Sequence, residues 1–220
     1  MTKIDHLVVG AANLSAGVEY VNGLLGVDMP YGGEHEKMGT HNHLMQLGSR
    51  LFLEVIAINP QALKPDRCRW YGLDDPEIQL EIKNQPRLLT WVVNTKDISA
   101  LIRSKLFDFG KPELISRSHL SWYFGLPDDG RLFEGGTLPY IIQWNTNQHP
   151  AVKMANLKCK FKSLDIYHPD TEWLGEVLTS IGALELVNLY QTAKPAHFIA
   201  NIETPQGLKQ LSSLLAVDSS

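Results

Sequence analysis

The sequence predicts an α+β fold built from tandem βαβββ modules. Two observations lead to this prediction. A strand, an Asn or Asp helix cap and a closing glycine recur three times along the 220 residues, and each predicted helix is followed by two or three strand-like segments. Any single βα unit would contain such signals, but three copies at nearly the same spacing indicate a repeated structural unit. The composition, 44% hydrophobic and 20% charged, is that of an ordered globular protein rather than a disordered chain.

The first copy begins with the apolar strand Ile4–Val9. Asn13 follows as a helix cap, whose side chain can accept hydrogen bonds from free amides of the first turn. Apolar residues then recur at helical spacing up to Gly26, and glycine allows the left-handed turn that ends a helix. Thr40–Leu47 and Leu51–Ile58 are rich in alternating and β-branched residues, so they predict two strands separated by a Gly-Ser turn.

The same order of elements returns twice. The strand Leu88–Val93 is followed after four residues by the cap Asp97, and the strand Phe161–Ile166 is followed after four residues by the cap Asp170. The second predicted helix carries Ile98, Leu101, Ile102 and Leu106 on one face. Gly110 closes the second helix, and the strands predicted after it are 113–116, 119–126 and 138–144. Gly182 closes the third helix, and the strands predicted after it are 184–190 and 197–202.

A long segment separates the first two modules. Residues 59–87 contain four prolines together with Trp70 and Tyr71. Segments of this length are commonly lids or binding loops, so we expect Trp70 and Tyr71 to cover the mouth of a cleft. The alternative is a flap that packs on the outside. The predicted organisation is a first βαβββ module at 1–58, a connecting loop or lid at 59–87, a second βαβββ module at 88–145 and a third, partial βαββ module at 156–217.

Several functional classes are disfavoured by composition and by missing motifs. A net charge of −4 argues against nucleic-acid binding, because such proteins need positive charge to neutralise phosphates. The sequence contains no phosphate-binding glycine loop and no serine nucleophile elbow. It contains no apolar stretch long enough to span a bilayer and no secretory signal, so we expect a cytoplasmic protein with no membrane partner.

Four parts of the sequence resemble one known family. They are Ile4–Val9, Gly39–Asn42 leading into Arg50–Ile56, Arg69–Leu73, and Gly135–Trp144. In this order they resemble the glyoxalase-like domain proteins of the vicinal-oxygen-chelate superfamily, which also includes bleomycin-resistance proteins and dioxygenases. The resemblance covers most of the chain. It implies paired modules whose curved mixed sheets enclose a cleft, with the helices on the outside.

The resemblance also implies where a metal would bind. Metal-using members take ligands, usually His, Glu or Gln, from the first and last strands of each paired module. On this pattern the first module offers His6 and Glu54, whereas the second offers Gln143 and has Thr90 at the position that corresponds to His6. Zn, Mn, Fe and Ni suit such nitrogen and carboxylate ligands about equally, but threonine is a poor ligand.

The two candidate ligands of the first module also need an explanation without a metal. His6 and Glu54 stand among apolar residues on predicted strands. A buried carboxylate is unfavourable unless it is paired, hydrogen-bonded or bound to a metal. Because His6 could be that partner, the sequence leaves two interpretations open, a metal site and a His–Glu pair.

Two more histidines are candidates for the same cleft. His41 and His43 are two residues apart on a predicted strand and therefore share a face, which points either into the cleft or to solvent. If the face points inward, we expect the catalytic residues to be Glu54 and His41, and the substrate to contact His43, Trp70, Tyr71 and Thr90.

The sequence supports two functional hypotheses from different classes. The first is an enzyme that acts on a small oxygen-rich metabolite by isomerase, lyase or dioxygenase chemistry at a divalent metal, which is what the resemblance implies. The second is a metal-free protein that binds or sequesters a small molecule in the same cleft, which Thr90 favours. A further hypothesis gives the third module a role in forming a homodimer, because its position corresponding to His6 is Ser163.

Overall fold

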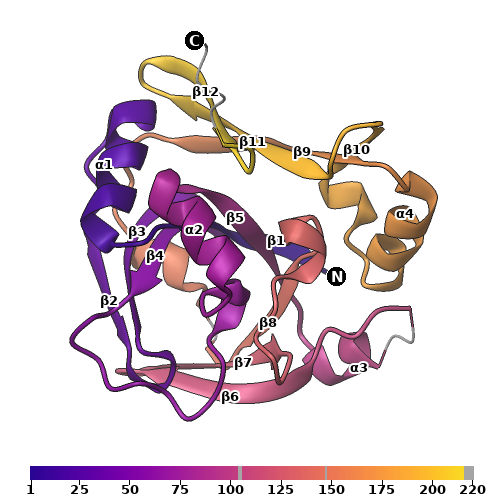
Figure 1. Ribbon diagram of the computed structural model, residues 1–220, viewed down its shortest axis with the longest axis horizontal. Coiled ribbons are helices and arrows are strands. Elements are labelled where there is room, and N and C mark those ends of the chain that lie inside the picture. Colours follow the sequence, from indigo (N-terminus) through magenta and orange to yellow (C-terminus); the bar gives the residue numbers. More distant parts are fainter. Residues whose placement is uncertain (104–105, 147, 216–220) are drawn as a thin grey trace.

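Two mixed β-sheets organise the chain in the computed structural model, which describes residues 1–103, 106–146 and 148–215. Within these ranges an eight-stranded sheet has the order β2-β3-β4-β1-β5-β8-β7-β6, and a four-stranded sheet has the order β10-β9-β11-β12 (Figure 1). This arrangement confirms the predicted α+β fold with curved mixed sheets. The strands are β1 (Lys3–Gly10), β2 (Tyr31–His35), β3 (Thr40–Gly48), β4 (Leu51–Ile58), β5 (Arg87–Asn94), β6 (Lys111–Arg117), β7 (Leu120–Leu126), β8 (Tyr140–Trp144), β9 (Lys160–His168), β10 (Asn188–Gln191), β11 (His197–Thr204) and β12 (Gly207–Ser212).

The helices are short and lie outside the eight-stranded sheet (Figure 1). No helix in the described ranges has the length and apolar character needed to cross a membrane. The α-helices are α1 (Leu14–Leu25), α2 (Pro76–Asn84), α3 (Ile98–Ile102) and α4 (Thr171–Ser180), and the 3₁₀ turns are η1 (Glu36–Met38), η2 (Trp70–Gly72), η3 (Phe133–Gly136), η4 (Pro150–Lys153) and η5 (Leu184–Leu186).

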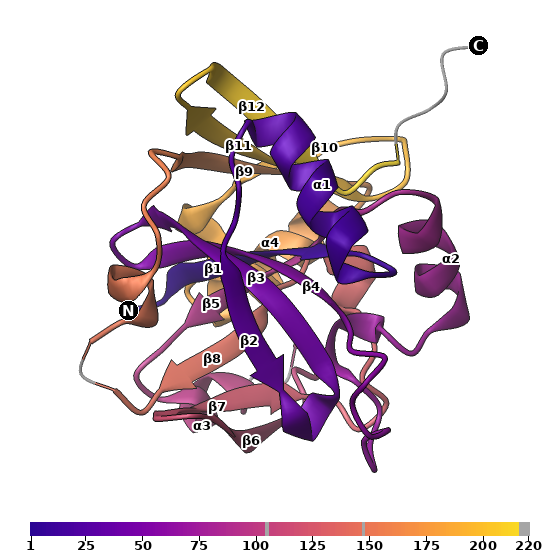
Figure 2. The same ribbon diagram turned by 90° about the vertical axis from the view of Figure 1, so that its left-hand side faces the viewer.

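The eight-stranded sheet consists of two similar halves. Residues 3–58 and 87–144 each run in the order β-α-β-β-β, and in each half the last strand lies parallel beside the first. The halves join where β1 pairs antiparallel with β5. The sheet curls so strongly that β2 and β6, at opposite ends of the strand order, approach each other (Figure 2). Lys37, just after β2, donates to the backbone carbonyl of Leu114 on β6.

The predicted helix caps form as expected. The side-chain oxygens of Asn13, Asp97 and Asp170 each accept a hydrogen bond from the backbone amide three residues later. The second helix is shorter than predicted, because α3 ends at Ile102 and the side chain of Leu106 is exposed. An exposed leucine contributes no buried apolar surface that would hold a longer helix against the sheet.

The third repeat folds with a different topology. Its strand β9 pairs in parallel with β10, the next strand in sequence, and antiparallel with β11 on its other side. The expected strand at 184–190 begins with the turn η5, and its strand portion is limited to β10. The four-stranded sheet lies across one end of the curled sheet (Figure 1), and its buried side chains join the same apolar core.

The segment between the two halves is folded rather than open. It contains the nine-residue helix α2, which is capped by Asp75 and begins with a proline, a residue suited to the first helical position. Trp70 and Tyr71, expected at the mouth of a cleft or on an outer flap, are both 2% exposed and pack into the interior. The middle of the segment expected as a loop or lid, 69–73, is therefore buried, whereas most residues of 60–68 are exposed.

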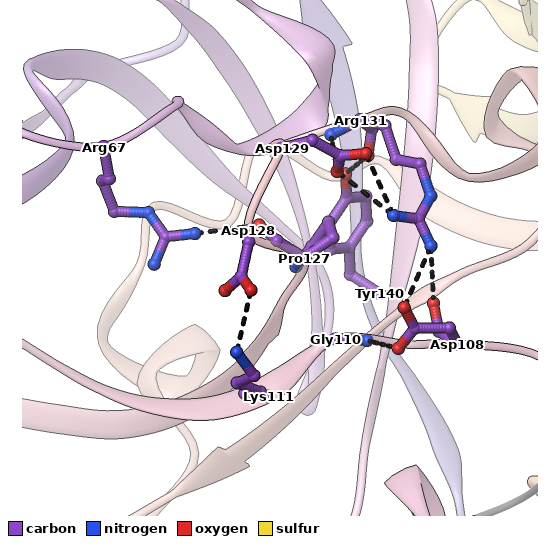
Figure 3. Close-up of polar contacts among 9 residues, drawn as sticks. All are labelled: Arg67, Asp108, Gly110, Lys111, Pro127, Asp128, Asp129, Arg131 and Tyr140. Atoms are coloured by element: carbon purple, nitrogen blue, oxygen red, sulfur yellow. Dashed lines mark hydrogen bonds and ion pairs between the residues drawn. The ribbon is translucent and has the colours of Figure 1, made fainter.

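The loop between β7 and β8 holds this segment in place. The Tyr71 backbone amide donates to the Tyr140 hydroxyl at 3.1 Å, and that hydroxyl donates to the carbonyl of Arg131 at 2.5 Å. Arg67 donates to the carbonyl of Pro127 (Figure 3). Tyr71 has a φ of 61°, an unfavourable value for a bulky residue. The hydrogen bonds that Tyr71 and Arg67 form with this loop hold Tyr71 in its strained conformation. Figure 3 also shows the ion pairs that anchor the loop, which are Lys111 with Asp128 and Arg131 with Asp108 and Asp129.

The glycine pair Gly135 and Gly136, before β8, provides a matched test of how closely the loop packs against β5. A Cβ at Gly136, where φ is 93°, would lie 2.1 Å from the carbonyl oxygen of Leu89, whereas a Cβ at Gly135, where φ is 61°, meets nothing within 4 Å. We expect Gly136→Ala to lower the free energy of unfolding by about 3 kcal/mol through steric clash and backbone strain. Gly135→Ala should lower it by only about 1 kcal/mol, from the backbone alone. Urea unfolding measures both, and equal losses would contradict the packing described here.

Candidate functional site

A small cavity lies inside the curled sheet. Its volume is about 30 Å³, enough for one or two water molecules. The wall is largely aromatic, with polar groups concentrated on one side. The polar residues on the wall are His6, His35, Asn42, Glu54 and Arg117, and the aromatic residues are Phe52, Trp70, Tyr71, Trp122, Phe124 and Trp144.

Strand register explains why the polar groups face inward. On the parallel strands β1 and β4, His6 lies beside Phe52 and Val8 lies beside Glu54. Cross-strand partners point to the same side of a sheet, so His6 and Glu54 share the inner face. On β3, Leu44 lies opposite Glu54, and Asn42, two residues earlier, points to the same side.

The centre of the site is a buried acid–base pair. The Nε2 atom of His6 is 3.7 Å from Oε2 of Glu54, and both residues are 4% exposed. The Asn42 side-chain amide donates to the other carboxylate oxygen of Glu54 at 2.6 Å. The His6 ring stacks on Phe52 with 4.5 Å between ring centroids. Packing and hydrogen bonding thus fix both side chains, while Nε2 and Oε2 remain facing each other at the cavity.

Asp5 holds His6 from behind. Its carboxylate is fully buried and accepts hydrogen bonds from Nδ1 of His6 at 2.7 Å and Nε2 of His149 at 2.9 Å. The side chains of Trp144 and Asn94 also donate to it, at 2.8 and 3.0 Å. Burial alone would raise the pKa of Asp5, but the hydrogen bonds and charges of the two histidines outweigh it and hold that pKa well below its usual range. Because the carboxylate accepts from Nδ1, Nε2 is the ring nitrogen of His6 that faces the cavity and Glu54.

A register shift in β1 brings Asp5 and His6 together. Adjacent residues on a regular strand point to opposite faces, yet both of these side chains are buried and hydrogen-bonded to each other. The pairing of β1 with β5 skips one residue between Ile4 and His6. Such a bulge re-aims side chains, and here it aligns the carboxylate with the imidazole.

Arg117 supplies positive charge from the opposite half of the sheet. Its Nη1 atom donates to Nε2 of His35 at 3.4 Å and to Oδ1 of Asn42 at 3.3 Å. A guanidinium can only donate, so Nε2 of His35 accepts and the ring's proton is on Nδ1, facing Thr40. Burial, together with the nearby charges of Arg117 and His6, lowers the pKa of His35 to about 3. His35 is therefore neutral near pH 7, and Arg117 is held by two neutral groups.

Four of the expected site residues border the cavity, namely His6, Glu54, Trp70 and Tyr71. Sequence reasoning missed Asp5, Asn42 and Arg117. The position of Asp5 directly before His6 in the sequence was a usable signal, because an adjacent carboxylate can orient an imidazole. Arg117 carries no local signal, because only the closing of the sheet brings it to this site.

The other expected site residues lie elsewhere. His41 and His43 share a face, as predicted, but it is the outer face of β3, where Nδ1 of His43 donates to the carbonyl of Met29. Gln143 also points outward, and its side-chain oxygen accepts from the amide of Ile98. Thr90 is buried beside Val8 and does not border the cavity. The structure therefore does not bring these four residues to His6 and Glu54.

The donor set does not fit a catalytic metal ion. Such sites usually take three protein ligands, and only His6 and Glu54 face each other here. Within the described ranges no three His, Cys, Asp or Glu side chains are grouped to hold an ion. The Oε1 atom of Glu54, which does not face His6, already accepts a hydrogen bond from the Asn42 amide. The Arg117 guanidinium adds a positive charge to the same wall.

Comparisons with known proteins agree with the fold. A family model described as a glyoxalase-like domain matches residues 4–182. No curated protein matches the chain. A hypothetical protein from Staphylococcus aureus has a similar structure, with a TM-score of 0.61 and 13% identity over 96% of this chain and 85% of that chain.

Two enzymes also appear among the similar structures. Methylmalonyl-CoA epimerase from Mycobacterium tuberculosis is 17% identical, covers 64% of this chain and 86% of its own, and has a TM-score of 0.39. A mutant of 4-hydroxymandelate synthase from Streptomyces coelicolor is 12% identical, covers 96% and 62%, and has a TM-score of 0.46.

The buried neutral His35 predicts a specific pH dependence. Between its ordinary pKa near 6.5 and its folded pKa of about 3, the unfolded chain binds a proton on this ring and the folded chain does not. Stability therefore falls as pH falls through this window. Relative to His35→Gln, we expect the wild type to lose on the order of 2–3 kcal/mol of unfolding free energy between pH 7 and pH 4. Urea titrations at both pH values measure this. The exposed control His119→Gln should follow the wild type, and an equal pH dependence of wild type and His35→Gln would contradict the assignment.

Proposed function

The chain belongs to the glyoxalase-like domain family, and from this premise we propose that it is an enzyme that moves a proton on a small, anionic, oxygen-bearing substrate. The observation that carries the proposal is the pair of His6 and Glu54, an acid and a base that face each other at 3.7 Å on the wall of a buried cavity. Titratable pairs with fixed geometry at a cavity are typical of acid–base catalysis.

Each member of the pair has a distinct role. Glu54 Oε2 accepts a proton from the substrate carbon beside a carbonyl, while Asn42 keeps the carboxylate oriented through its other oxygen. The electron pair of the broken C–H bond moves toward the carbonyl oxygen, which becomes negative. Protonated His6 donates a hydrogen bond from Nε2 to that oxygen and keeps its proton. Return of the proton from Glu54 to the opposite face of the same carbon re-forms the carbonyl and completes an epimerisation. An isomerisation results when the reacting carbon carries a hydroxyl, whose proton moves to the former carbonyl oxygen while Glu54 returns its proton to the neighbouring carbon.

Asp5 supports His6 in this step as a positioning residue. Its hydrogen bond to Nδ1 orients the imidazole ring and keeps Nε2 pointed at the cavity. Because the same carboxylate is held by Trp144 and Asn94, it cannot swing into the cavity and compete with Glu54.

The rest of the wall favours a substrate that carries negative charge. Among the described residues Arg117 forms no ion pair with a carboxylate, and its side chain hydrogen-bonds to His35 and Asn42. Trp70 borders the cavity, and its buried indole N–H finds no hydrogen-bond acceptor among the residues that the structure describes. A substrate oxygen would satisfy such a donor, and a carboxylate would pair with Arg117.

A metal-free binding protein is the second candidate function. It is favoured by the size of the inner cavity, because about 30 Å³ admits only the reacting group of a substrate. A ligand held mainly outside this cavity could be bound without contacting Glu54. Binding without any proton exchange would identify this function.

Proton exchange with solvent tests the enzyme proposal. In D₂O the wild type should accelerate the loss of the C–H signal beside the carbonyl in at least one member of a panel of short 2-oxo acids, followed by ¹H NMR. Glu54→Gln should slow that exchange by about 10²- to 10⁴-fold, because it removes the base. Glu203→Gln, an exposed change on the other sheet, should have no effect. Exchange that persists in Glu54→Gln, or no exchange with any member, would refute the proposal.

Metal analysis tests the assignment of chemistry to side chains alone. Wild type prepared without chelator and supplied with Zn, Mn, Fe or Ni should retain far less than one equivalent after gel filtration, because only two ligands converge. His6→Ala and Glu54→Gln should give the same low value. Stoichiometric metal in the wild type that is lost in both variants would instead establish the metal-dependent chemistry implied by the family resemblance.

A further inference from the structure

A second and larger hollow adjoins the inner cavity. Its volume is about 540 Å³, within the range of small-molecule sites. The two hollows share Leu44, Arg117, Pro150 and Met154 as wall residues, so they are neighbours and Arg117 stands between them. We call the larger hollow the outer chamber.

The outer chamber combines an apolar wall with positive charge. Leu44, Leu120, Pro150 and Met154 are among its apolar residues. Its charged residues are Arg117 and the exposed Lys153, and among the described lining residues there is no Asp or Glu. The chain as a whole carries a net charge of −4, so this local excess of cations runs against its overall charge.

Two histidines on the same wall have different roles. His149 lies against Asp5, whose carboxylate already compensates for any positive charge on its ring. His119 is exposed on the loop between β6 and β7, and it adds positive charge only when protonated. The permanent cations of the chamber are therefore Arg117 and Lys153.

Arg117 is unusual among the partly or fully buried arginines. Arg67, Arg69 and Arg87 each pair with a carboxylate. Arg117 has no such ion pair in the described ranges, and its contacts are the neutral His35 and Asn42. Lys153 likewise forms no ion pair there. The charge of Glu54 acts on Arg117 from a distance, but no carboxylate among the described residues forms an ion pair with the guanidinium. Arg117 therefore remains available to pair directly with an external negative group.

We propose that the outer chamber binds an organic anion with an apolar body of several carbons, whose negative group pairs with Arg117 and Lys153. This inference rests on the proposed function where it identifies the anion as the substrate. The reacting carbon and its oxygen enter the inner cavity beside Glu54, and the apolar body lies against Leu120 and Met154. The inner cavity then binds the reacting group of the molecule, and the outer chamber binds its apolar body.

Equilibrium binding of three eight-carbon probes tests the charge preference. Octanoate, 1-octanol and octylammonium share one apolar body, and isothermal titration calorimetry or tryptophan fluorescence reports their binding. We expect octanoate to bind at least tenfold more tightly than the other two. Acetate, which lacks the apolar body, should bind at least tenfold more weakly than octanoate. Equal affinity for octanoate and octanol, or no octanoate binding, would overturn the proposal.

Variants assign the preference to this chamber. Arg117→Gln and Lys153→Gln should each weaken octanoate binding, by roughly 10- to 100-fold for the partly buried Arg117, and leave octanol binding unchanged. Because Lys153 is exposed, Lys153→Gln keeps the test independent of folding effects. Lys162 pairs with Glu203 on the other sheet, and Lys162→Gln is the matched control. Octanoate affinity that is unchanged in both Arg117→Gln and Lys153→Gln would place the anion elsewhere and overturn the proposal.

The binding test is separable from the test of catalysis. Glu54→Gln should retain octanoate binding, because Glu54 does not line the outer chamber. If octanoate follows the charge pattern and no 2-oxo acid exchanges its proton, the catalytic proposal fails and the anion chamber stands. If exchange is found and octanoate binding ignores Arg117 and Lys153, the chamber proposal fails and catalysis stands.

Discussion

The buried carboxylate of Asp5 is the constraint on which the site depends. A fully buried charge is strongly unfavourable unless every acceptor position is used, and Asp5 uses four donors to meet this requirement. Those donors come from β1, β5, β8 and the segment before η4. One side chain therefore links both halves of the curled sheet to the connection that leads to the third repeat. The interaction that fixes His6 at the cavity is also the one that holds these elements together.

The two halves contribute different chemistry to the cavity. The first half supplies His6, Glu54 and Asn42 from three neighbouring strands, and the second supplies Arg117 with aromatic walls. This difference arises although both halves have the same order of strands. Strand register causes this difference. Gln143 corresponds to Glu54 in the sequence, but the pleat of β8 turns the Gln143 side chain to the outer face of the sheet.

Local signals predicted the elements well and long-range contacts poorly. The helix caps, the first strand and the His6–Glu54 pair could be found because each rests on periodicity or on the need of a buried carboxylate for a partner. The inward face of β3 could not, since Leu44 and Met45 are adjacent apolar residues and leave the alternation ambiguous. The position of Arg117 and the different strand order of the four-stranded sheet depend on how distant segments meet, which no local pattern encodes.

The proposed chemistry needs no bound metal, because Arg117 supplies positive charge at the cavity. A divalent ion shared by both halves would provide positive charge opposite the substrate oxygen, with ligands from each half. Here the second half provides a permanent cation directly, on the same wall as Glu54 and hydrogen-bonded to the Asn42 side chain that also holds Glu54. A guanidinium offers several fixed donors to an oxyanion and needs no ligands of its own. The residues expected to complete a metal site are then free for structural roles, as the bond of Gln143 to the first turn of α3 illustrates.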